Sequence, residues 1–165
     1  MKLINSLKAL SGVEQTTFFF SLLVLATSLT QPAFYINRAD NPAAWVDSLY
    51  LFFFGWTFPL GGAIIPFLIW CANPIYLISI FNTLNKKINR KIVGFILSII
   101  ATIIAFSFSQ LKTIITSEAG GKSSIKSLEL GYKLWLFSFV IMSIGLGINL
   151  YLVFSHKRKT IKNIN

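Results

Sequence analysis

Asn73 is a polar amide in a long apolar run, directly before Pro74. A proline within a helix removes the hydrogen-bond donor for the carbonyl four residues earlier, which here belongs to Trp70. The Asn73 amide, or the side chains of Cys71 and Tyr76, could satisfy backbone groups that such a break frees. Asn73 is therefore interpreted first as a structural hydrogen-bonding plug, and alternatively as the lining of a small polar cavity.

The other reactive residue types do not form a catalytic arrangement. The single histidine, His156, lies in the basic tail, and no base is positioned beside a serine or threonine. The lone Cys71 cannot build a disulfide or metal site by itself. Asp40 and Asp47 share one polar segment and could contact a cation, although a solvated turn is the simpler explanation. We predict no enzymatic activity, no cofactor and no metal site. All carboxylates lie in polar segments: Glu14, Asp40, Asp47, Glu118 and Glu129.

The composition indicates an integral membrane protein. Charged residues make up 12% of the 165-residue chain, against about 25% in a soluble domain. A helix needs roughly 20 apolar residues to cross a bilayer. Each of four runs without Asp, Glu, Lys or Arg has that length, and no histidine lies inside a predicted span. The runs cover residues 15–37, 48–85, 92–111 and 134–156.

The run over residues 48–85 has an awkward length. As one straight helix it would extend ~57 Å, more than the ~40–45 Å of a whole bilayer. Two spans would need ~40 residues and a turn. The helix breakers Pro59, Gly61 and Gly62 therefore predict that the chain folds back near the outer face.

We predict an all-α polytopic protein. A short outer interfacial or re-entrant helix over 42–57, with Asn41 and Pro42 as its start signal, precedes the second span. Pro66 falls in the first turn of that span, and Pro74 should kink it. The single domain covers residues 1–165, and its four spans cover residues 17–33, 63–84, 92–111 and 134–154.

The first apolar segment also has features of a signal peptide. A charged start precedes an apolar centre and small residues at 26–28. The small residues match a cleavage site poorly, and the apolar run continues beyond them. We treat the segment as the first span, with a cleaved leader as the alternative.

The distribution of Lys and Arg predicts the orientation. Ten lie in the N-terminus, the 85–91 loop and the C-terminal tail, and five lie in the 35–47 and 112–133 loops. The positive-inside rule then places both termini in the cytoplasm, which fits an even number of spans. The basic loop and tail could also contact anionic lipid headgroups. Nucleic-acid binding would need a larger basic surface with interleaved aromatic residues.

Small residues mark candidate helix-packing interfaces. Four of them lie on one stripe of the third predicted span, and two more are four residues apart in the last span. Such residues let another helix approach closely. Packing within the bundle is the simpler use, and docking of a partner or a second copy is the alternative. The residues are Gly94, Ser98, Ala101, Ala105, Ser143 and Gly147.

Two sequence segments carry a resemblance to a known group. One is Gly55-Trp56 followed by Trp70-Cys71-Ala72-Asn73-Pro74, and the other runs from Gly131-Tyr132 to Leu136-Phe137-Ser138. Together they resemble small bacterial membrane proteins of uncharacterised function that carry GW…WxANP and GYxLWLxS segments. This resemblance implies a bacterial cytoplasmic membrane and one fold for the whole chain, and it transfers no active site.

Three functions fit these observations. The favoured hypothesis is an accessory or interaction subunit of the bacterial inner membrane, because no charged intramembrane residue or internal repeat supports transport. The second is a homo-oligomeric, holin-like pore lined by Asn73 or serine faces. The third is a small solute carrier that uses the broken helix, including Asn73, Pro74, Gly61 and Gly62.

Overall fold

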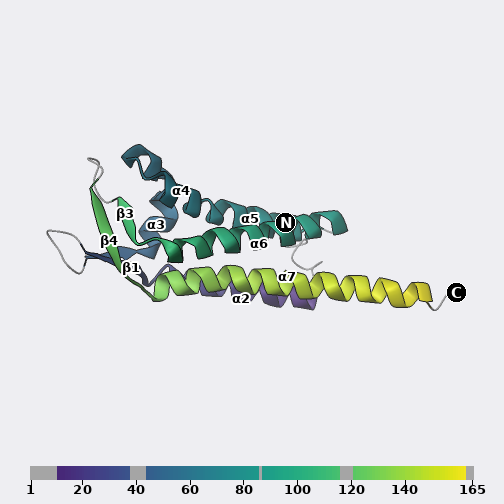
Figure 1. The fold of residues 1–165 in the computed structure, drawn as a ribbon. Coiled ribbons are helices and arrows are strands. Elements are labelled where there is room, and N and C mark those ends of the chain that lie inside the picture. Colours follow the sequence, from purple (N-terminus) through teal and green to yellow (C-terminus); the bar gives the residue numbers. More distant parts are fainter. Residues whose placement is uncertain (1–10, 38–43, 86, 116–120, 163–165) are drawn as a thin grey trace, which may run out of the picture.

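The computed structural model describes residues 11–37, 44–85, 87–115 and 121–162, with side chains to residue 156. It is an elongated bundle of helices with a β-sheet at one end (Figure 1). Helix α2 lies against α7, α7 against α6, and α6 against α5. The end of the bundle that carries the strands is called the sheet end here.

Helix α2 (Gly12–Ser28) begins earlier than the predicted first span. Ser11 caps it, because the Ser11 Oγ accepts from the Glu14 amide and the Glu14 carboxylate accepts from the Ser11 amide. This capping box satisfies donors that would otherwise be unpaired at a helix start. The chain then leaves the helix before Pro32, so the predicted end at residue 33 is wrong.

Within the described residues, three helical segments are long and apolar enough to cross a membrane. The first, Ile64–Thr83, consists of α4 (Ile64–Trp70) and α5 (Ala72–Thr83), which are separated at Cys71. The others are Ile88–Gln110 and Leu130–His156. They include α6 (Ile88–Ser107), η2 (Phe108–Gln110) and the first part of α7 (Leu130–Lys162). The first predicted span, over residues 17–33, is not among them, since α2 has 17 residues.

The segments 35–47 and 112–133, which we predict to be outer loops, contribute to a four-stranded sheet, so the all-α class is not confirmed. The sheet is antiparallel throughout, in the order β2-β1-β4-β3. The buried face of β1 packs on side chains from α4, η2 and α7. The strands are β1 (Pro32–Asn37), β2 (Ala44–Asp47), β3 (Thr113–Ile115) and β4 (Lys122–Leu128).

The predicted helix over 42–57 is replaced by three elements. Strand β2 occupies its first described part, α3 (Ser48–Phe54) follows, and the 3-10 helix η1 (Gly55–Gly61) contains Pro59. Asn41 and Pro42, the predicted start signal, lie outside the described residues. Gly62 ends η1 with a φ of 76°, a left-handed conformation that glycine adopts without a steric penalty.

The bundle core is close-packed through small residues. An added Cβ on Gly145 of α7 would lie 2.0 Å from the Thr17 Oγ1 of α2, and one on Gly94 of α6 would lie 2.7 Å from the Thr83 Oγ1 of α5. Real side chains do not approach so closely, so these glycines set the helix spacing. Tyr76 stacks on Phe139 inside this core, with ring centroids 4.5 Å apart.

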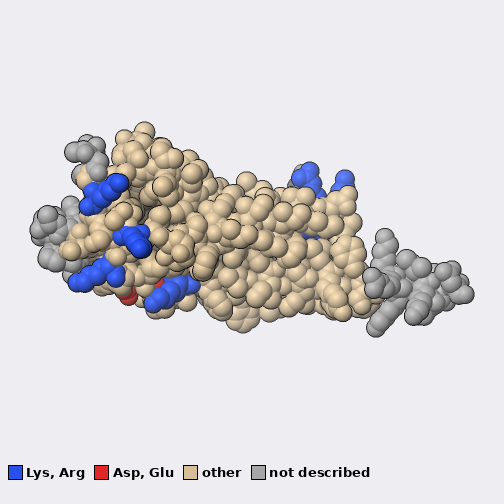
Figure 2. Space-filling view, viewed as in Figure 1, with Lys and Arg blue, Asp and Glu red and all other residues tan. Residues whose placement is uncertain are grey.

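The described charges lie at the two ends of the molecule, and the surface between them is uncharged in the view of Figure 2. At one end, Lys122 and Lys126 lie in β4, and Lys112 and Lys133 lie just before β3 and in the first turn of α7; at the other end, Lys87 and Arg90 lie at the start of α6. Many large apolar side chains are exposed along the uncharged surface, including Phe81 and Ile103. A belt of this kind is what a hydrocarbon environment favours.

Candidate functional site

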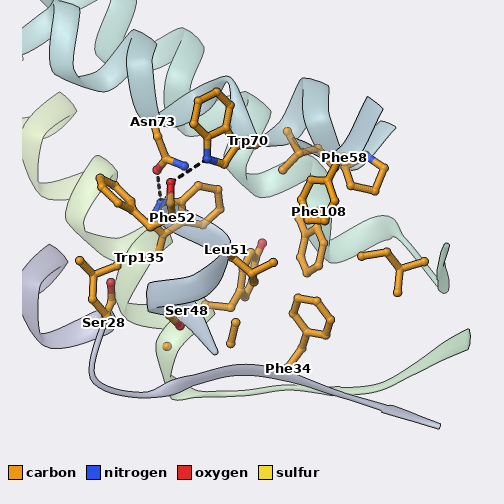
Figure 3. Close-up of a pocket in the computed structure, with 17 residues that line it drawn as sticks. Ser28, Phe34, Ser48, Leu51, Phe52, Phe58, Trp70, Asn73, Phe108 and Trp135 are labelled. Atoms are coloured by element: carbon orange, nitrogen blue, oxygen red, sulfur yellow. Dashed lines mark hydrogen bonds between the residues drawn. The ribbon is translucent and has the colours of Figure 1, made fainter. Parts of the chain in front are cut away.

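A half-open cavity of about 80 Å³ lies where the sheet meets the bundle (Figure 3). We call it the junction cavity. Its walls come from the end of α2, from β1 and β3, and from the folded-back segment, which is α3 and η1. The broken helix of α4 and α5, η2 and the start of α7 complete them. The lining is mostly apolar, and it includes Ser28, Ala33, Phe34, Ser48, Leu51, Phe58, Trp70, Asn73, Phe108 and Trp135.

Trp70 forms one fixed wall of the cavity. Its indole Nε1 donates a hydrogen bond of 2.9 Å to the Phe52 carbonyl, which ties α4 to α3. The ring lies over Gly55, where an added Cβ would come within 2.2 Å of it. Glycine at position 55 is therefore required for the folded-back segment to lie against the broken helix.

Asn73 lies just past the break between α4 and α5 and is buried. Its Oδ1 accepts a hydrogen bond of 2.8 Å from the Trp135 Nε1 of α7, and this bond is drawn in Figure 3. The side chain thus links two helices and also lines the cavity. Both interpretations stay predictions, because the partner of Asn73 Oδ1 is an indole and not the backbone freed by Pro74, and the cavity is mostly apolar.

Ser48 has an unusual environment at the first residue of α3. It is 7% exposed, and its Oγ is the one buried side-chain oxygen or nitrogen among the described residues without a hydrogen-bond partner. Serines within helices usually donate to a carbonyl one turn earlier, but a residue at this position has no helical turn before it. Gly131 packs directly on the hydroxyl, because an added Cβ there would lie 2.1 Å from Ser48 Oγ.

The opposite end of the bundle holds a polar cluster around the buried Glu14 and Asn149, which the sequence did not lead us to predict. We call it the Glu14 cluster, and it consists of Ser11, Glu14, Lys91 and Asn149. Lys91 Nζ lies 2.6 Å from Glu14 Oε1, and Asn149 Nδ2 donates to the same oxygen at 2.7 Å. Ser11 Oγ donates to Asn149 Oδ1 at 2.8 Å. These contacts join α2, α6 and α7 at one point.

Further hydroxyl groups hold the bundle together between its two ends. Ser21 Oγ lies 2.5 Å from the Tyr76 hydroxyl and donates to the Ser138 carbonyl at 2.7 Å. Ser79 Oγ donates to the Gly94 carbonyl at 2.7 Å. Each bond gives a partner to a polar group that would otherwise be unpaired in a hydrocarbon environment.

The small residues singled out from the sequence lie inside this bundle. The stripe on α6 is buried along its full length, comprising Gly94, Ser98, Ala101 and Ala105. Ser143 is half-buried, and its Oγ lies 3.1 Å from the Thr102 Oγ1 of α6. Gly147 faces the Phe95 ring, which would lie 3.2 Å from an added Cβ. Gly61 and Gly62 lie at the tip of the folded-back segment, away from the cavity lining.

Two of the missed features have signals in the sequence. The Ser11-x-x-Glu14 spacing is a capping-box pattern and predicts a helix start near residue 12. Asn149 is an amide within an apolar run, as Asn73 is. The environment of Ser48 has no comparable signal, because it depends on the approach of Gly131 from a distant part of the chain.

Among the residues that the structure describes, no three His, Cys, Asp or Glu side chains gather closely enough to hold a metal ion. Asp47 precedes α3 without a side-chain capping bond, and Asp40 lies outside the described residues. Compared with protein families, with curated proteins and with solved structures, the chain shows no significant match. The resemblance to the GW…WxANP proteins stays a prediction.

Proposed function

We propose that this chain is a non-enzymatic, multi-pass protein of a bacterial cytoplasmic membrane that acts as an interaction subunit of a larger assembly. The proposal rests on a difference between the helices and the sheet in how many of their contact groups are already used within the molecule. The small-residue stripe of α6 and the hydroxyls of the described helices are engaged within the bundle. They are therefore less suited to holding a partner.

The sheet end, unlike the bundle, has groups that are available to a partner. Strands β2 and β3 are the two edges of the sheet, and edge strands carry backbone groups that can pair with another chain. Trp45 of β2 is 58% exposed, and exposed aromatic residues are frequent anchors at protein interfaces. We propose that the partner binds at this end.

The proposal includes α2 as a fourth crossing. Its 17 residues are at the lower limit of roughly 17–25 for a membrane helix. It packs along α7, whose own candidate span has 27 residues. Four crossings, together with the excess of Lys and Arg on one side, favour cytoplasmic termini. Anionic headgroups would then contact the basic loop and tail.

A fusion experiment tests this topology. A reporter that is active only in the cytoplasm should work at the C-terminus and fail when inserted beside Gly121. The opposite pattern would contradict the orientation, and activity of both fusions would contradict the crossing by α7, which separates the two sites.

The interaction is tested by purifying the tagged full chain in a mild detergent and analysing the eluate by native mass spectrometry. We expect one second protein at a fixed ratio. The same chain with Trp45→Ala should lose it, whereas Phe81→Ala on the exposed face of α5 should retain it. A closed homo-oligomer without another protein would contradict the proposal.

A solute carrier is the second candidate, because Trp70 and Asn73, on the two sides of the break at Cys71, line the junction cavity. It predicts saturable uptake of a solute by proteoliposomes, which an interaction subunit would not show. The pore hypothesis has less support, since Asn73 is engaged by Trp135. A pore would conduct ions in liposomes and change its conductance on Asn73→Leu.

A further inference from the structure

We propose that the junction cavity binds the carbonyl end of one acyl chain of a membrane lipid, with Ser48 donating a hydrogen bond to the ester carbonyl. The inference does not rest on the interaction proposed above, because it concerns the cavity and not Trp45 or the backbone of the edge strands.

The cavity walls suit an apolar ligand. Phe34, Leu51, Phe58 and Phe108 present apolar surface to the space. A volume of about 80 Å³ corresponds to roughly six water-sized spheres. Apolar cavities hold water poorly and accept apolar guests. A hydrocarbon chain therefore suits the lining better than a sugar, nucleotide or ion.

Ser48 lines this space and is more than nine-tenths buried, and its Oγ has no hydrogen-bond partner among the described residues. Leaving such a group without a partner is unfavourable. A carbonyl oxygen of a ligand would supply the missing acceptor. By contrast, Ser28 lines the same cavity but its Oγ already donates to the Leu25 carbonyl at 2.6 Å. The site thus has one hydroxyl available for a ligand with one polar group.

The cavity also lies at one end of the apolar region. Ser48 packs on Gly131, which is at the start of the candidate span Leu130–His156 and two residues before Lys133. Ester carbonyls of a bilayer occupy this boundary region, between the hydrocarbon core and the headgroups.

The cavity can be reached from the surrounding bilayer. The half-buried lining residues come mainly from α3, η1 and α4, including Leu51, Phe58 and Trp70, so the mouth lies along this segment. The outer surface of the same segment exposes Phe53 and Leu68, which are 59% and 56% accessible. A lipid beside this surface can insert the beginning of one chain and leave the remainder in the bilayer.

The test measures quenching of tryptophan fluorescence by a phosphatidylcholine that is dibrominated near its ester groups. The full chain carries Trp45→Phe and Trp56→Phe, which leaves Trp70 and Trp135, both in the cavity wall. The lipid is titrated into the protein in an unbrominated detergent. We expect saturable quenching, with the half-saturating concentration raised about threefold to tenfold by Ser48→Ala, as for one lost hydrogen bond.

Ser28→Ala is the matched control and should leave the titration unchanged. Ala33→Leu, which fills the space, should abolish saturable quenching while the thermal unfolding temperature shows that the protein is folded. Non-saturable quenching, or equal curves for the Ser48→Ala variant and the parent, would overturn the proposal. Saturable binding of a dibrominated free fatty acid without binding of the phospholipid would also overturn it, because the ester would not be the recognised group.

Discussion

The two ends of the bundle differ in whether their buried polar groups have hydrogen-bond partners. At the Glu14 cluster, a carboxylate, an ammonium group, an amide and a hydroxyl satisfy one another across three helices. At the sheet end, the Ser48 hydroxyl is buried beside an open space without a partner. A satisfied cluster fixes a structure, whereas an unsatisfied group beside a cavity is available to a ligand.

The difference has a physical basis in how the two ends are built. The Glu14 cluster forms between regular helices, which place side chains in a fixed register. The junction cavity forms where the folded-back segment, the broken helix and the sheet meet. Irregular elements do not fill space as efficiently as parallel helices do, so a cavity remains there. Substitutions at the two ends should therefore have effects of different size and sign.

The largest effect is expected from Lys91→Met, which leaves the Glu14 carboxylate buried without its cation. Removing one partner of a buried ion pair costs about 3–5 kcal/mol. The thermal unfolding temperature in detergent should fall markedly, whereas Lys87→Met, at an exposed position of the same turn, should leave it nearly unchanged. Equal stability of the two variants would contradict a structural role for the cluster.

Gly131→Ala should have the next largest effect. An added Cβ would lie 2.1 Å from Ser48 Oγ and 2.6 Å from the Gln31 and Pro32 carbonyl oxygens. Overpacking of this kind costs typically 1–3 kcal/mol, and we expect about 3 here because backbone atoms are involved. Gly147→Ala is the control, since it meets only a Phe95 ring at 3.2 Å. Comparing their unfolding temperatures shows whether Gly131 sets the approach of α7 to Ser48.

Trp135→Phe tests the wall of the cavity. Phenylalanine keeps one aromatic ring but has no N–H, so the Asn73 Oδ1 loses its donor, at an expected cost of about 1–2 kcal/mol for the hydrogen bond alone. Adding Asn73→Leu removes the unpaired amide, so the double variant should recover part of the lost stability. Additive losses in a double-mutant cycle would contradict the coupling of α5 to α7 through this bond.

The smallest effects come from single hydroxyls, and here the sign should differ between two serines. Ser79→Ala removes a bond to the Gly94 carbonyl and should destabilise by about 0.6 kcal/mol, the usual size for hydrogen bonds within membranes. Ser48→Ala removes a hydroxyl without a partner among the described residues, so stability should stay constant or rise. A clear loss of stability for Ser48→Ala in delipidated protein would contradict the description of the cavity.

The helical part of the fold could be predicted because its signals are local. The uncharged runs locate the three candidate spans within a few residues, and the breakers at Pro59 and Gly62 indicate where the chain folds back. The stripe from Gly94 to Ala105 follows from the helical repeat alone, and the structure buries it. Such features depend on residues that are neighbours in the chain.

The sheet and the cavity could not be predicted in the same way. Strand β4 has the sequence KSSIKSL, which is polar and has no clear strand periodicity. It becomes a strand by pairing with β1, about 90 residues earlier in the chain. Ser48 is ordinary in the sequence and unusual only beside Gly131. Asn73 was identified as chemically distinctive, but its partner Trp135 lies in another helix.

The measurement that tests the account most directly is photo-crosslinking of the full chain in its native membrane. A photoreactive residue is placed at position 45 on the edge strand β2, and in a second variant at position 103 on the exposed, apolar surface of α6. We predict one discrete protein adduct from position 45 and only lipid adducts from position 103. A protein adduct from position 103 alone would show that partners bind the bundle, and it would contradict the assignment of interaction to the sheet end.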